Sequence, residues 1–147
     1  EDKFLSSYER LLRSLISDLE LFDNIYFCGR MNPDGMAKQI SNSHCFVNPS
    51  IMEVHAGSLR EAMLVGIPSI STFCGSVGEF MQEGVTGYLY RYEEHEVLAY
   101  KLRKIFDDDD IAQKIGQAAR NKMLSFRREN RDSELFSIYK KILGEEK

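Results

Sequence analysis

The chain has 147 residues, of which 43% are apolar and 29% charged, and this length corresponds to about one domain. Nineteen Lys and Arg residues against 23 Asp and Glu residues give a net charge of −4, which argues against a protein dedicated to binding nucleic acid. No apolar stretch approaches the ~20 residues that cross a bilayer, and no secretion signal begins the chain, so we expect a cytoplasmic protein.

The three cysteines point to a reducing compartment. Cys28, Cys45 and Cys74 are odd in number and contain no CxxC pair, so they predict neither a disulfide framework nor a zinc cluster. We therefore expect buried free thiols and no metal site.

Periodicity and turn residues predict an alternation of helices and short strands. Apolar residues recur at three- and four-residue spacing from residue 3 to residue 20, which is typical of an amphipathic helix. Asn32 followed by Pro33 marks a helix start, and Gly66 followed by Pro68 marks a helix end. The expected elements are, in chain order, helix 3–20, strand 25–28, helix 33–42, strand 44–47, helix 58–65, strand 69–73, a short apolar turn at 77–81, strand 87–90, helices 97–105 and 111–124, and a C-terminal helical segment within 125–147.

This alternation predicts an α/β fold, a Rossmann-like doubly wound parallel sheet covered on both faces. Ligands of such sheets bind beyond the carboxyl ends of the strands, where loops lead into helix N-termini. Ala56, Gly57 and Ser58 precede or begin such a helix, and small residues there let main-chain N–H groups approach a diphosphate. Glu53 in the loop, and Glu61 in the expected first helical turn, can accept hydrogen bonds from the vicinal hydroxyls of a ribose or a pyranose.

An ordered set of motifs carries a family resemblance. The set consists of Asn24 to Gly29, Val47-Asn-Pro-Ser50, Glu53 to Pro68 with its two Glu eight positions apart, Gly75 to Glu79, and Glu83-Gly-x-x-Gly87-Tyr-Leu. Between Asn24 and about Met123 the chain resembles the C-terminal domain of the retaining GT-B glycosyltransferases of family 4, the glycosyl transferases group 1.

The resemblance implies a role for each candidate site residue. Glu61 would bind the nucleotide ribose, and Glu53 would contact the donor sugar near the reacting centre as the candidate catalytic residue. The amides of Ala56, Gly57 and Ser58 would hold the diphosphate of a UDP- or GDP-sugar. The main chain at Gly29, Arg30 and Met31 would border the base. No dedicated metal or other cofactor is implied.

The chain departs from the family pattern in two respects. Val54-His55-Ala56-Gly57 stands where the family commonly has Gly-Phe-Gly after the first Glu, which affects sugar specificity more than phosphate approach. The family's phosphate-binding Arg and Lys, its acceptor site and its catalytic His have no counterpart. We therefore expect residues 1–147 to be a partial donor-binding domain that lacks its first two strands, with strand 1 of the usual order 3-2-1-4-5-6 belonging between segments 25–29 and 44–48.

Several residues keep two interpretations. His55 and Glu79 either contact the donor or serve as a surface-loop histidine and a helix-start carboxylate. The run Asp107 to Asp110 suggests a cation site, but a loop that favours the next helix N-terminus explains it better. Arg127, Arg128 and Arg131 either face anionic lipid, as a peripheral membrane contact, or form a solvated helix face.

The resemblance implies transfer of a sugar from a nucleoside-diphosphate sugar, with retention, to a glycan or lipid-linked acceptor held by an N-terminal domain. This chain would supply the donor-binding half of that hexosyltransferase, and would be inactive alone. A non-catalytic nucleotide-sugar-binding or scaffold domain is the alternative.

Overall fold

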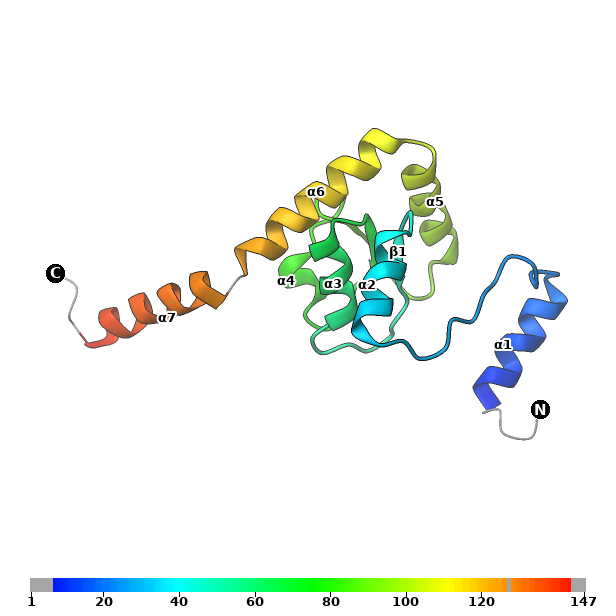
Figure 1. Ribbon diagram of the computed structural model, residues 1–147, viewed down its shortest axis with the longest axis horizontal. Helices are drawn as coiled ribbons and strands as arrows, with labels where there is room; N and C mark the ends of the chain where they lie inside the picture. Colours follow the sequence, from blue (N-terminus) through cyan, green and yellow to red (C-terminus); the bar gives the residue numbers. More distant parts are fainter. Residues whose placement is uncertain (1–6, 127, 144–147) are drawn as a thin grey trace. The chain divides into compact units, whose positions relative to one another are not determined.

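The computed structural model describes residues 7–126 and 128–143. The chain divides into two compact units, residues 1–32 and residues 33–147 (Figure 1). Among the described residues, no helix is both long enough and apolar enough to cross a membrane.

Within residues 7–32, the first unit contains one helix, α1 (Ser7–Asp18), followed by an irregular segment. The helix lies inside the expected range 3–20, whose first four residues fall outside the described part of the chain. The expected strand at residues 25–28 is wrong, because these residues have no strand geometry and pair with no strand. A β-prone run becomes a strand only where a neighbour accepts and donates its main-chain hydrogen bonds, and Tyr26 is instead 89% exposed.

The second unit contains the predicted parallel sheet. Its strands are β1 (Phe46–Asn48), β2 (Ser69–Thr72) and β3 (Tyr88–Tyr90), in the order β1-β2-β3. The central strand β2 is buried at every position, as expected for a parallel sheet that is covered on both faces.

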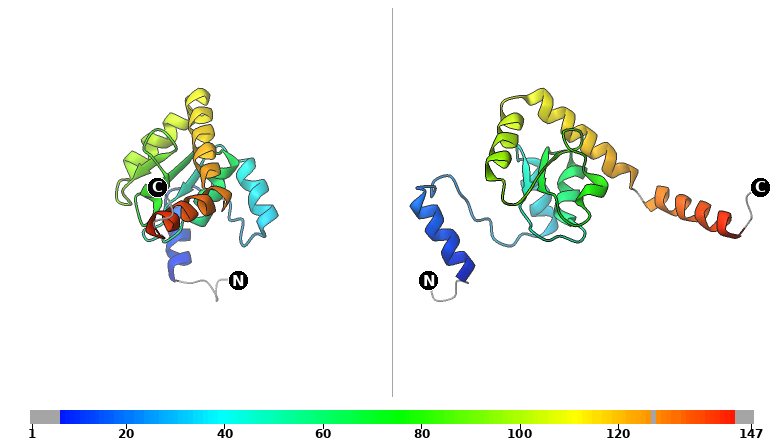
Figure 2. Two further views of the ribbon diagram at one scale, coloured as in Figure 1. Left: turned by 90° about the vertical axis from the view of Figure 1, so that its left-hand side faces the viewer. Right: turned by 180° about the vertical axis from the view of Figure 1, so that it is seen from behind.

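Helices cover both faces of this sheet (Figure 2). They are α3 (Gly57–Val65), α4 (Val77–Phe80), α5 (His95–Phe106) and α6 (Asp109–Ser125). The unit also contains α2 (Pro33–Ser41), which packs on α3, and α7 (Arg128–Leu143), which extends away from the sheet (Figure 2). On one face, residues of α3, α4 and the end of α6 pack on Phe46 and Leu89. On the other, residues of α5 and the start of α6 pack on Ile70 and Tyr88. The doubly wound arrangement is thereby confirmed for this unit.

An ion pair closes the outer edge of β3. The main-chain N–H of Leu89 donates to the Glu83 carboxylate at 2.6 Å, and Lys101 donates to the Leu89 carbonyl. Lys101 Nζ and Glu83 Oε1 lie 2.7 Å apart. In a parallel strand, the main-chain N–H and C=O groups of alternate residues point to opposite sides, and those of Leu89 point away from β2. Glu83 and Lys101 therefore make the hydrogen bonds that a further strand would otherwise make. β1 is the other edge strand, and no described strand pairs with its outer side.

Candidate functional site

Two loops meet at the carboxyl ends of β1 and β2. Residues 49–56 connect β1 to α3, and residues 73–76 connect β2 to α4. The side chain of Asn48 donates to Ser71 Oγ at 3.3 Å and accepts from Ser50 Oγ at 3.0 Å, so it joins the two strand ends at the base of these loops. The predicted residues from Glu53 to Glu61 all lie in the first loop and the helix that follows it.

The first turn of α3 presents main-chain N–H groups. Ala56 precedes the helix in the left-handed conformation, with φ 45°, and its side chain cannot cap the helix. The N–H of Arg60 donates to the Ala56 carbonyl at 3.0 Å, so the amides before it have no intrahelical acceptor. A Cβ at Gly57 would meet no atom within 4 Å, and Ser58 is exposed. This helix start is open to an anion.

The two predicted carboxylates differ in exposure. Glu53 is half-buried in the loop, whereas Glu61 is exposed on the helix. The helix begins at Gly57, one residue earlier than expected, so the prediction that Glu61 lies in the first turn is wrong; it lies at the fifth helical residue. Ala56 marks this boundary, because a residue with a left-handed main chain cannot belong to the right-handed helix. His55, between the two, is exposed.

A shallow depression of about 200 Å³ lies beside Glu61. Its lining residues are Arg60, Glu61, Leu64, Met123 and Phe126. The Arg60 guanidinium lies over the Phe80 ring, 4.4 Å from its centroid. This contact fixes the helix residue next to Glu61 against α4.

The other predicted donor residues lie in other parts of the chain. Gly29, Arg30 and Met31 belong to the first unit, so their grouping with α3 stays a prediction. Glu79 is exposed in the first turn of α4. It lines a different depression, of about 320 Å³, together with Gln82 and Lys122.

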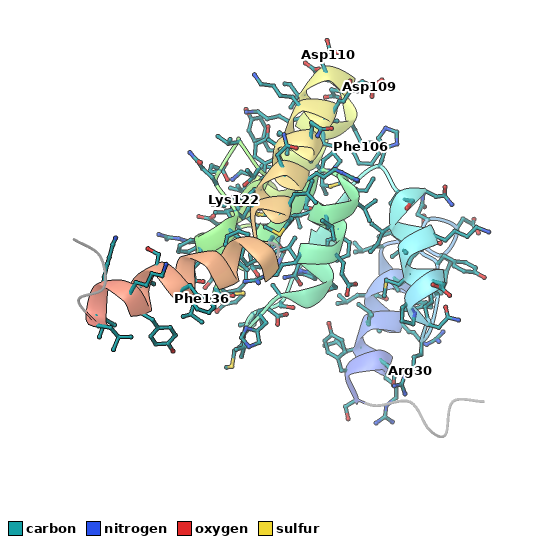
Figure 3. The ribbon with its side chains drawn as sticks, turned by 60° about the vertical axis from the view of Figure 1, so that its left-hand side comes forward. Arg30, Phe106, Asp109, Asp110, Lys122 and Phe136 are labelled. Carbon is teal, nitrogen blue, oxygen red and sulfur yellow. The ribbon has the colours of Figure 1, made fainter. Side chains whose placement is uncertain are left out.

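The acidic run before α6 forms a helix start. The Asp108 carboxylate accepts a hydrogen bond from the N–H of Ile111 at 3.0 Å, and Asp109 and Asp110 occupy the first turn (Figure 3). In residues 7–126 and 128–143, no group of three or more His, Cys, Asp or Glu side chains could hold a metal ion. Arg127 lies outside the described residues, as do the side chains of Arg128 and Arg131, so the membrane-facing interpretation stays a prediction.

The two half-buried cysteines lie at opposite ends of the sheet. Cys45 precedes β1 among the apolar residues that α5 covers, and burial raises the pKa of its thiol to about 12. Cys74 follows β2 and donates to the Ser50 carbonyl at 3.3 Å. Burial, and to a smaller extent the charge of Cys74, raises the pKa of Tyr90. Cys28 is exposed, which is contrary to the expected burial of all three thiols, because the strand predicted around it does not form.

Sequence reasoning missed the residues that support the Glu53 loop. These residues are Thr72, Gly75 and Ser76, which contact the loop from the neighbouring strand end. Their partners lie about 22 residues away along the chain, so no local pattern reveals them. The sequence signal is limited to two hydroxyl residues, one at the last position of a buried strand and one four positions later.

Comparison with known proteins gives a match over most of the chain. The family model described as "Glycosyl transferases group 1" matches residues 6–122. The N-acetyl-alpha-D-glucosaminyl L-malate synthase of Bacillus anthracis is 29% identical over 134 residues, which are 90% of this chain and 35% of that protein. The chain spans about a third of the length of the first curated relatives that it matches.

Solved structures show the same fold. The sucrose-phosphate synthase of Thermosynechococcus elongatus superimposes with a TM-score of 0.80 at 23% identity, over 98% of this chain and 37% of that one. Anabaena HepE, in complex with UDP and glucose, gives a TM-score of 0.79 at 24% identity, over 88% of this chain and 36% of that one. The second unit is thus a partial Rossmann-like domain of the GT-B type.

Proposed function

The chain belongs to the glycosyl transferases group 1 family, and from this membership we propose that it forms the donor-binding half of a retaining GT-B glycosyltransferase of family 4. The observation that carries the proposal is the open first turn of α3, which is bordered by Glu53 and Glu61 at the carboxyl ends of the strands. A diphosphate and the hydroxyls on either side of it match these groups.

The donor is a UDP- or GDP-sugar. The amides of Ala56, Gly57 and Ser58 hold its diphosphate, Glu61 accepts hydrogen bonds from the ribose, and Glu53 from the sugar hydroxyls. The structures of HepE with UDP and with UDP-glucose support this class of donor, because that protein has the same fold.

The reaction breaks the bond between the anomeric carbon and the diphosphate and forms a bond from that carbon to an acceptor hydroxyl, with the same anomeric configuration. The nucleoside diphosphate departs with the bonding electrons, and one of its oxygens takes up the proton of the acceptor hydroxyl. Main-chain N–H groups and the positive end of the α3 dipole stabilise the negative charge that develops on the leaving diphosphate. Glu53, which is held next to them, orients the sugar.

The remaining parts of the site come from outside the second unit. Gly29, Arg30 and Met31 border the base, and an N-terminal domain binds a glycan or lipid-linked acceptor. The outer edge of β1 receives the strand that the order 3-2-1-4-5-6 places beside it. The enzyme works in the cytoplasm or at the cytoplasmic membrane face and needs no dedicated metal ion.

The test is calorimetric titration of the full-length protein with UDP- and GDP-sugars, followed by an assay for sugar transfer. Glu61→Gln is expected to weaken donor binding about ten-fold, because it replaces a charged acceptor of hydroxyl protons with a neutral amide. Glu96→Gln, which alters an exposed carboxylate of α5, serves as the matched control. Absence of binding to every donor would refute the proposal, and donor binding without transfer to any acceptor would favour a nucleotide-sugar-binding scaffold.

A further inference from the structure

The loop that carries Glu53 has little main-chain structure of its own. In the part of the chain that the structure describes, residues 49–55 make no hydrogen bond between main-chain groups. A loop without such bonds keeps one conformation only if other groups hold it.

Three side chains from the neighbouring strand end supply those bonds. Thr72 Oγ1 donates to the Ser50 carbonyl, and Cys74 Sγ donates to the same carbonyl at 3.3 Å. Ser76 Oγ donates to the Val54 carbonyl at 2.7 Å. Residues 72, 74 and 76 thus hold the loop at two points, one on each side of Glu53.

The main chain of Glu53 also rests directly on Gly75. A Cβ at Gly75 would lie 1.6 Å from the Glu53 carbonyl oxygen, and Gly75 adopts φ +51°. Only glycine allows both the conformation and the contact. The loop after β2 therefore fixes the position of the Glu53 main chain.

Ser76 is the most informative of these residues. It occupies the N-cap position of α4, where a serine hydroxyl usually accepts a hydrogen bond from the helix, yet its side chain makes no cap bond. Its hydroxyl is directed to Val54 instead. The local stability of α4 does not explain this bond, whereas the position of the Glu53 loop does.

We propose that Ser76, together with Thr72 and Gly75, positions Glu53 for the donor sugar. Ser76 is a positioning residue that acts through the main chain of the loop and does not touch the donor. The inference rests on the proposed function, since it assumes that Glu53 contacts the sugar.

The test compares two affinities of the full-length protein. UDP and GDP measure binding of the nucleotide alone, and UDP-glucose and GDP-mannose measure binding of the nucleotide with its sugar. Ser76→Ala is expected to weaken binding of the sugar donor about three- to ten-fold relative to the bare nucleotide, the loss that corresponds to one hydrogen bond. Ser76→Thr keeps the hydroxyl and should restore the wild-type ratio.

Two further variants make the result decisive. Ser41→Ala removes a hydroxyl that donates to the Ala37 carbonyl at the same distance of 2.7 Å, but inside α2, and should leave the ratio unchanged. Glu53→Gln should lower the ratio of sugar-donor affinity to nucleotide affinity at least as much as Ser76→Ala does.

Each outcome has one meaning. Failure of the wild-type protein to bind any of the four ligands would overturn the proposed function, and the inference with it. A drop in the ratio for Glu53→Gln but not for Ser76→Ala would overturn the inference alone. An equal loss of nucleotide and sugar-donor affinity in Ser76→Ala would show a merely structural role, and would overturn the inference as well.

Discussion

At its amino end, α3 leaves the main-chain N–H groups of its first turn without helical partners, and a Cβ at Gly57 would meet nothing within 4 Å. At its carboxyl end, Arg120 donates to the carbonyls of Leu64 and Val65, at 3.2 Å each. Gly116 of α6 lies so close to Gly66 that a Cβ on it would be 2.1 Å from the Gly66 carbonyl oxygen. One helix is thus open at the candidate site and closed at the far end.

The two ends of α3 are held by different kinds of contact. The carboxyl end of α3 is fixed by tight packing against α6. The opposite end is fixed by side chains that donate to main-chain carbonyls, which leaves other polar groups free for a ligand. Substitutions at the two ends should therefore change different measured quantities.

The largest expected effect comes from Gly116→Ala. The added methyl group would overlap the Gly66 carbonyl, which is main chain and cannot rotate away, so we expect a loss of at least about 3 kcal/mol in the free energy of unfolding. Urea unfolding measures this loss.

Gly57→Ala is the matched substitution at the open end of α3. Here the methyl group meets empty space, and we expect the free energy of unfolding to change by less than about 1 kcal/mol. Donor affinity should fall, because the methyl group stands where a phosphate approaches the main chain. A large loss of stability in Gly57→Ala, or none in Gly116→Ala, would break the comparison.

Most of the fold could be predicted from the sequence, because its signals are local. Pro33 at a helix start and Gly66 at a helix end marked boundaries that the structure confirms. The segment 25–28 failed for the opposite reason: its β-prone side chains show a preference, but a strand depends on a partner that local sequence does not reveal.

The candidate site could be predicted only in part. The segment from Glu53 to Glu61 is continuous in sequence, so its helix start and its carboxylates were found together. The support from Ser76 and Gly75 depends on two loops that the parallel sheet brings side by side, and the ion pair of Glu83 with Lys101 depends on the edge of β3. These contacts became visible only in three dimensions.

The next largest effect concerns the closed end again. Arg120→Met removes the guanidinium that caps the last carbonyls of α3 and complements the negative end of its dipole, so we expect a loss of about 1 kcal/mol. The control is Lys114→Met, which alters another exposed cation of α6, the helix that carries Arg120. It should change the free energy of unfolding by less than about 0.5 kcal/mol. Donor affinity should be unchanged in both variants.

Cys45 makes the amino end of the sheet sensitive to alkaline pH. Because burial raises the pKa of its thiol from 9.0 to about 12, the folded state keeps a proton that the unfolded state releases. The contribution of the protonated Cys45 thiol to the free energy of unfolding is fully present below pH 9 and is lost as the pH rises toward 12. At pH 10 the wild-type protein should have lost roughly 1 kcal/mol more, relative to pH 8, than Cys45→Ala loses over the same interval. Equal losses would show that the thiol ionises as readily in the folded chain as in the unfolded one.

The smallest expected effect comes from Ala56, at the open end of α3. Ala56 has a left-handed main chain, as does Gly66 at the closed end. Ala56→Gly relieves about 1 kcal/mol of conformational strain. It also removes a buried methyl group, which costs about 0.8 kcal/mol, and it adds freedom to the unfolded chain, which costs about 0.5 kcal/mol more. The free energy of unfolding should therefore change by less than about 0.5 kcal/mol, while Gly66→Ala should lose about 1 kcal/mol because its strain is not offset. If Ala56→Gly instead stabilised the protein by more than 1 kcal/mol, the methyl group would contribute nothing to the core, and the strain at Ala56 would serve the helix start alone.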